Sequence, residues 1–125
     1  MARHRAPRRE YPRMVRVNAL LQEIIGDELE RIDDDRLELV TVTAVDCESD
    51  LRRAVVQYDS LRGAEDDEVV LAALGEMRPR LQKAVARQAR LKRTPELRFE
   101  PDVVIRAAER VDEVLRSIEP PHDPT

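Results

Sequence analysis

Apolar residues recur at intervals of three and four positions in three segments of the chain. The segments run from about Pro12 to Ile32, over about 68–92, and from about Arg106 to Ile118. This spacing places an apolar stripe along one side of a helix. We therefore predict helices in all three, with Pro12 in the first turn of the first helix, where a missing N–H costs nothing.

Three other segments have the composition of β-strands. Residues 37–47 and 53–61 are rich in β-branched side chains, and the short connection between them indicates an antiparallel pair. A third strand is expected after Pro95. Its strand residues would be Leu97, Phe99, Val103 and Ile105. Pro101 has no N–H to donate, which predicts an edge position or a bulge for this strand.

The predicted order is therefore α-β-β-α-α-β-α, an α+β fold with a three-stranded sheet. We expect one domain over residues 11–118, a flexible basic arm over 1–10 and a disordered tail over 119–125, since both ends are polar and broken by proline. No apolar run approaches the roughly 20 residues that span a bilayer. The arginine-rich start lacks the apolar stretch of a secretory signal, so a cytoplasmic location is expected.

The middle helical segment contains two residues that disfavour a helix interior. Gly75 costs about 1 kcal/mol relative to alanine, and Pro79 clashes with the carbonyl of the residue four positions earlier, which is Gly75 itself. If a new helix starts near Gly75, the conflict disappears, because first-turn N–H groups have no helical partner. We predict a helix–kink–helix arrangement, about 68–74 and 76–92. An ordinary helix that ends at Gly75 and is capped by it fits the pattern too.

Charge is unevenly distributed along a chain whose formal net charge is −4. Residues 1–22 carry a net +5, residues 23–50 a net −9, and residues 76–95 a net +6. Within the last segment, four basic residues recur at intervals of three and four, which predicts a stripe on one flank of the helix. They are Arg80, Lys83, Arg87 and Arg90. Such a stripe is either a solvated face or a surface that binds an anion, and the sequence leaves both open.

Residues that could support catalysis are few. His4 and His122 fall in the predicted ends, and Cys47 has no histidine near it in the sequence, so we interpret it as a small buried apolar residue. The three aspartates at 33–35 fit a solvated turn better than a metal site, because no ligand pattern surrounds them. No motif for a nucleotide, cofactor or catalytic nucleophile is found. We expect a protein that is not an enzyme and has no cofactor, metal or small-molecule substrate.

Several segments together resemble ribosome-binding factor A, a family of bacterial assembly factors of the small ribosomal subunit. The segments RMVRVNALLQEIIGDEL and VTVTAVDCESDLRRAVVQY are similar to the first helix and the strand pair of the family. Ala73-Leu74-Gly75 matches its Ala-x-Gly kink. Pro95, Leu97, Phe99 and Asp102 match its Pro-x-Leu-x-Phe-x-x-Asp signature. The similarity covers about residues 10–118.

The resemblance implies a type II KH-like fold in which Ala-x-Gly replaces the usual Gly-x-x-Gly loop. It also implies binding to immature 30S particles and to 16S rRNA near its 5′ helix, during late maturation and rRNA processing, with a role in growth at low temperature. We expect a monomer when free. The candidate RNA-binding residues are Ala73, Gly75, Arg78, Arg80, Lys83, Arg87, Arg90, Lys92, Arg93, Arg13 and Arg16. Arginines 3, 5, 8 and 9 would add a flexible contact.

A different hypothesis gives the protein no direct role with RNA. The acidic segment 23–50 or the last helix would then bind a basic protein partner. Salt dependence separates the two hypotheses, because release of counterions from about four to six phosphates of a single strand gives a log–log slope of roughly −3 to −4.

Overall fold

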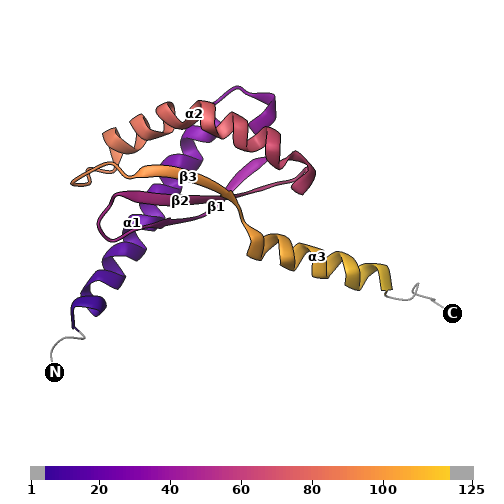
Figure 1. Ribbon diagram of the computed structural model, residues 1–125, viewed down its shortest axis with the longest axis horizontal. Coiled ribbons are helices and arrows are strands. Elements are labelled where there is room, and N and C mark those ends of the chain that lie inside the picture. Colours follow the sequence, from indigo (N-terminus) through magenta and orange to yellow (C-terminus); the bar gives the residue numbers. More distant parts are fainter. Residues whose placement is uncertain (1–4, 119–125) are drawn as a thin grey trace.

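The computed structural model describes residues 5–118, and their side chains from Pro12 onward. The helices are α1 (Arg5–Glu30), α2 (Asp67–Gln88) and α3 (Val103–Ile118), and the strands are β1 (Val40–Cys47), β2 (Arg53–Ser60) and β3 (Glu96–Pro101). Two short 3-10 turns, η2 (Asp35–Leu37) and η3 (Ala64–Asp66), precede β1 and α2 (Figure 1). The tail predicted over 119–125, the first four residues, and the side chains of Arg5, Arg8 and Arg9 lie outside the described residues.

The three strands form one sheet in the order β1-β2-β3. β1 pairs with β2 in the antiparallel direction, as predicted, with Val45 opposite Val56. β3 pairs with β2 in the parallel direction, with Phe99 beside Val56. Pro101 therefore ends an edge strand, which confirms its predicted position.

One face of the sheet carries the core. Alternate residues of β2, from Ala54 through Val56 to Tyr58, are at most 1% exposed, because successive side chains of a strand point to opposite faces. α1 and α2 cover this face with buried residues such as Leu21, Ile25, Leu74 and Leu81. The opposite face is more exposed and carries polar residues such as Arg53 and Arg98.

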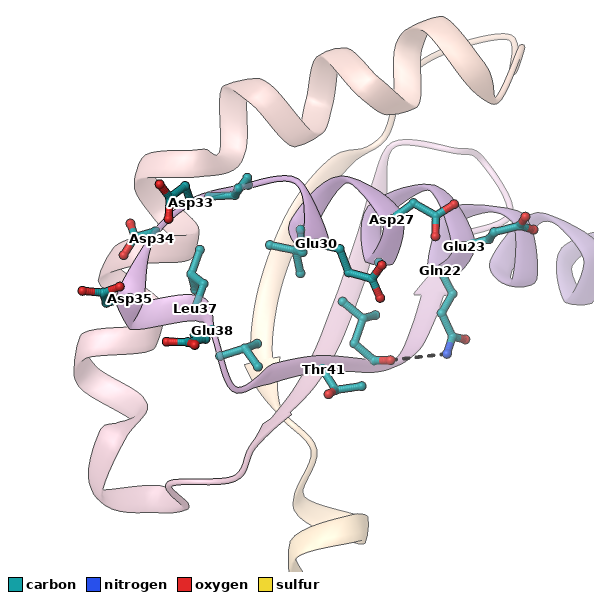
Figure 2. Close-up of a pocket in the computed structure, with 15 residues that line it drawn as sticks. Gln22, Glu23, Asp27, Glu30, Asp33, Asp34, Asp35, Leu37, Glu38 and Thr41 are labelled. Atoms are coloured by element: carbon teal, nitrogen blue, oxygen red, sulfur yellow. Dashed lines mark hydrogen bonds between the residues drawn. The ribbon is translucent and has the colours of Figure 1, made fainter.

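The middle segment forms one helix rather than two. α2 runs without interruption from Asp67 to Gln88 and contains both Gly75 and Pro79, so the predicted break into 68–74 and 76–92 is wrong, as is the end at residue 92. Its axis nevertheless bends beside the turn that contains Asp34 and Asp35 (Figure 2). A proline bends a helix without ending it when the lost hydrogen bond and the crowded carbonyl are accommodated by a change of axis. The kink is present, but helical structure continues through it.

Other boundaries differ from prediction for local reasons. α1 begins at Arg5, so Pro12 lies inside the helix rather than in its first turn. β1 begins at Val40 because Asp34 accepts a hydrogen bond from the Arg36 N–H and starts the turn η2 before it.

The third strand is also shorter than predicted. Val103 and Ile105, expected in β3, belong to α3. The reason is Asp102, whose carboxylate accepts a hydrogen bond from the Ile105 N–H at 3.0 Å. Asp102 thereby caps the start of the last helix. Its other oxygen accepts a hydrogen bond from the Thr43 hydroxyl, which ties this cap to β1.

α3 projects away from the rest of the protein (Figure 1). Every residue from 107 to 118 is exposed. The helix is fastened at its base by Arg106, which is 12% exposed and donates hydrogen bonds to Asp59 and Asp67. Asp67 also accepts a hydrogen bond from the Tyr58 hydroxyl at 2.8 Å. This cluster sets the direction in which α3 leaves the sheet.

Candidate nucleic-acid interface

The four basic residues of the predicted stripe have different environments. Arg80 forms an ion pair with Glu28 of α1, with 2.7 Å between Nε and Oε2. The Glu28 side chain is only 9% exposed, whereas that of Arg80 is 45% exposed. The hydrogen bond from Arg80 lowers the pKa of Glu28, against the opposing effect of burial. Arg80 thus neutralises a buried carboxylate between two helices, and its main role is to stabilise the fold rather than to bind a ligand.

Lys83 and Arg87 lie beyond this pair on α2 and are exposed. Arg90 comes after the end of the helix, and its φ of 53° is in the left-handed region. The stripe therefore does not continue at helical spacing to Arg90, since a residue of this conformation terminates a helix. Within the described part of the chain, none of the three forms an ion pair.

Three further candidates come together from two distant parts of the sequence. Arg13 of α1 and Lys92 and Arg93 of the α2–β3 connection line one hollow of about 370 Å³. Its remaining wall is the tip of the β1–β2 hairpin, Ser49, Asp50 and Leu51. Arg16 is exposed on the same helix as Arg13. We use the name basic end for the exposed basic residues of α1, of the last turns of α2 and of the connection after it. Its members are Arg13, Arg16, Lys83, Arg87, Arg90, Lys92 and Arg93.

The candidates near the bend of α2 are separate from the basic end. Ala73 is fully buried in the core. Gly75 is exposed, and a Cβ placed there would meet nothing within 4 Å, so packing inside the protein does not require a glycine at this position. Arg78 is exposed and holds its guanidinium carbon 5.8 Å from the centre of the Phe99 ring, a cation–π distance.

The surroundings of the bend are acidic. Glu76 forms an ion pair with Arg36 at 2.8 Å, and Arg36 also pairs with Asp34 at 2.7 Å. Asp33 and Asp35 lie on either side of Asp34 (Figure 2). An approaching phosphate would therefore meet mixed charge at the bend. At the basic end it would meet a majority of positive charge, with Asp50 as the carboxylate in the wall of the hollow.

Two structural residues of this region were not identified from the sequence. The Gln82 side chain accepts a hydrogen bond from the Leu97 N–H at 2.7 Å and donates one to the Pro95 carbonyl at 3.0 Å. It thereby holds the start of β3 against α2. For Arg106, the sequence pattern indicates only the beginning of the last helix. No local pattern marks either residue, because their partners lie at least 13 positions away in the sequence.

Cys47 lies in the core, as predicted. It is 5% exposed, and burial raises the pKa of its thiol to about 11, so the thiol is protonated near neutral pH. Among residues 5–118, no group of three or more potential ligand side chains is arranged to hold a metal ion. No helix in this described part combines the length and apolar character needed to cross a membrane.

The element order, the sheet order and the bent helix on the sheet define a KH-like α+β domain. Residues 13–115 match the family described as Ribosome-binding factor A, and the chain belongs to this family. It is 42% identical over 104 residues to ribosome-binding factor A of Rubrobacter xylanophilus. The aligned region covers 82% of this chain and 84% of the relative.

Two structures of ribosome-binding factor A have a similar fold. The crystal structure of ribosome-binding factor A from Thermus thermophilus matches with a TM-score of 0.65 and 33% identity, over 70% of this chain and 94% of that one. A homology model of the Thermus thermophilus factor, fitted into a cryo-electron-microscopy map of a complex with the 30S subunit, matches with a TM-score of 0.56 and 35% identity. That match covers 66% of this chain and 88% of the other.

Proposed function

We propose that this protein binds free or immature 30S subunits in the cytoplasm and assists their assembly without catalysing a reaction. Membership in the ribosome-binding factor A family supports the assembly role, and a relative of this fold has been fitted into a map of a 30S complex. We further propose that the contact is to 16S rRNA near its 5′ helix, during late maturation and rRNA processing, and that it serves growth at low temperature.

The basic end is the observation that supports RNA as the ligand. Arg13 meets Lys92 and Arg93 around one hollow, although it lies far from both in the sequence. Lys83 and Arg87 extend the same charge along α2. Unpaired, exposed guanidinium and ammonium groups bind phosphate oxygens and release counterions on doing so.

Binding of phosphates positions the protein, and the shape of folded rRNA would supply specificity. In the proposed contact, the basic end holds the phosphate backbone, while Gly75 lets a nucleotide approach the exposed bend of α2 closely. Arg78 adds a charge next to the bend. Stacking on aromatic side chains has little part, because the only aromatic residues are Tyr11, Tyr58 and Phe99, of which Tyr58 is buried.

The test reverses the charges of Lys83 and Arg87, which form no ion pair with any side chain that the structure describes. We expect K83E/R87E to reduce cosedimentation with 30S particles strongly while leaving the unfolding midpoint nearly unchanged, since both side chains are exposed. The matched control is R110E/R116E, which makes the same change of charge on exposed residues of α3 and should cosediment like the wild type.

Salt dependence provides the second measurement. Loss of two phosphate contacts to a single strand should reduce the slope of log affinity against log salt by about 1.4. If K83E/R87E cosediments normally, or if both variants lose binding equally, the basic end is not the docking surface.

A further inference from the structure

β1 is an edge strand whose outer side is only partly covered. Near its end, the Asn18 side chain of α1 accepts a hydrogen bond from the Cys47 N–H at 2.8 Å. Gln22 donates longer hydrogen bonds, of 3.5 Å and 3.3 Å, to the carbonyls of Val42 and Thr43. The side chains of α1 therefore protect the second half of the edge well and its first half weakly.

The backbone groups at the start of β1 face outward. The Leu39 carbonyl accepts a hydrogen bond from the Leu61 N–H, so residue 39 faces the β2 side. Because the hydrogen-bonding direction alternates along an antiparallel strand, the N–H and C=O of Val40 and Val42 point to the open side. The bond from Gln22 to the Val42 carbonyl agrees with this alternation. An open edge of this kind can accept one more strand.

A groove of about 610 Å³ runs along this edge, between β1 and the second half of α1. Apolar residues such as Leu29, Leu37 and Val42 lie in its lining. Figure 2 shows Glu30 of α1 and Thr41 of β1 on opposite sides of it, with the Gln22 bond at one end.

The rim of the groove is acidic. The lining includes seven carboxylates and no lysine or arginine. They come from α1 (Glu23, Asp27 and Glu30), from the turn at residues 33–35 and from Glu38. Asp34 is paired with Arg36, and within the described residues no ion pair involves the other six. A nucleic acid would be repelled here, whereas a cationic chain would be attracted.

We propose that this groove binds an extended, lysine- or arginine-rich segment of a protein partner, which adds to the sheet as a strand beside β1. Backbone hydrogen bonds to Val40 and Val42 would give affinity, and the carboxylates of α1 would select basic side chains on one face of the added strand. Binding here does not require RNA contact at the basic end, because the two surfaces use different residues. The protein would thus hold RNA and a basic protein segment at the same time.

The probe is a fluorescent nine-residue peptide of alternating lysine and threonine, in which all lysines share one face of a strand. We expect saturable binding by anisotropy at low salt, with the largest amide shifts in NMR spectra at Val40 and Val42. A peptide of the same sequence with its five central amides N-methylated keeps the charge but cannot pair as a strand. It should bind at least about tenfold more weakly, and equal binding of the two peptides would overturn strand addition.

Protein variants locate the site. D27K/E30K reverses the charge of two exposed carboxylates of the groove and should lower the affinity for the peptide at least about tenfold. E109K/E113K makes the same change on exposed residues of α3 and should leave peptide affinity unchanged. If both variants weaken binding equally, the attraction is a property of net charge and the groove is not a site.

The same reagents separate this proposal from the proposed function. K83E/R87E should lose its binding to 30S particles and retain its binding to the peptide. D27K/E30K should lose its binding to the peptide and retain its affinity for RNA. If K83E/R87E weakened binding of the peptide as strongly as D27K/E30K does, the two surfaces would not be separate.

Discussion

Substitution of Arg80 by glutamine tests whether this residue serves the fold rather than the ligand. The change removes the ion pair to Glu28, a carboxylate whose side chain is 9% exposed. A hydrogen bond to a charged group contributes about 1.5–3 kcal/mol to stability. A value near or below the lower end of this range applies, because Arg80 is 45% exposed and Arg31 remains 3.4 Å from the same carboxylate. We expect a loss of about 1–2 kcal/mol, or a melting temperature lower by roughly 3–8 °C.

The assay is a double-mutant cycle in thermal or urea unfolding, with Glu28→Gln as the second change. Lys83→Gln is the matched control, since it removes one exposed charge of the same helix and should stay within about 0.5 kcal/mol of the wild type. A coupling energy between Arg80 and Glu28 below about 0.3 kcal/mol would refute the structural role.

The pH dependence supplies an independent check. Arg80 lowers the pKa of Glu28 below its ordinary value of 4.5 in the folded protein. A lowered pKa stabilises the fold above the ordinary value, and that contribution is lost as the pH falls through the folded-state pKa. The stability difference between the wild type and Arg80→Gln should therefore be full at neutral pH and shrink in acid. A difference that is constant down to strongly acidic pH would contradict the assigned pair.

Three further predictions concern other parts of the protein. Gly75→Ala should stabilise α2 by about 0.5–1 kcal/mol, because the added methyl meets open space. Weaker 30S binding together with a higher melting temperature would show that close approach of RNA to the backbone at Gly75 matters. Unchanged 30S binding would exclude such an approach. Arg106→Ala should release the base of α3, lower the NMR order parameters in α3 and reduce stability by about 2–4 kcal/mol. The exposed control Arg110→Ala should change neither the order parameters nor the stability. If α3 stayed equally rigid in Arg106→Ala, Arg106 would not be the residue that holds it. Overall stability should fall as the pH drops below about 4.5, because the pKa of Glu28, Asp67 and Asp102 is lowered in the folded protein. Burial opposes this shift for Asp67, but hydrogen bonds from Arg106 and Tyr58 outweigh it, and the hydrogen bond from Thr43 lowers the pKa of Asp102. Urea unfolding at several pH values measures the effect, and a stability that rises in acid would refute it.

Local sequence located the helical segments, the strand pair and the family, although it divided α2 into two helices. Periodicity identified α1, α2 and α3, and β-branched composition identified β1 and β2, because these signals depend on neighbours within a few positions. The predicted boundaries of elements were wrong where a single side chain decided them, as at Asp34 before β1 and Asp102 before α3.

Spacing alone could not show which charges are free. Arg80 and Lys83 look equivalent in the sequence, yet the packing of α1 against α2 places buried Glu28 beside the first and leaves the second exposed. The same packing brings Arg13 next to Lys92 and Arg93 and leaves the first residues of β1 open beside an acidic helix flank. The sequence determined the elements and the segments of charge, because those are properties of consecutive residues. Only the tertiary structure decided which charges pair and which remain available, because electrostatic pairing depends on distance in space.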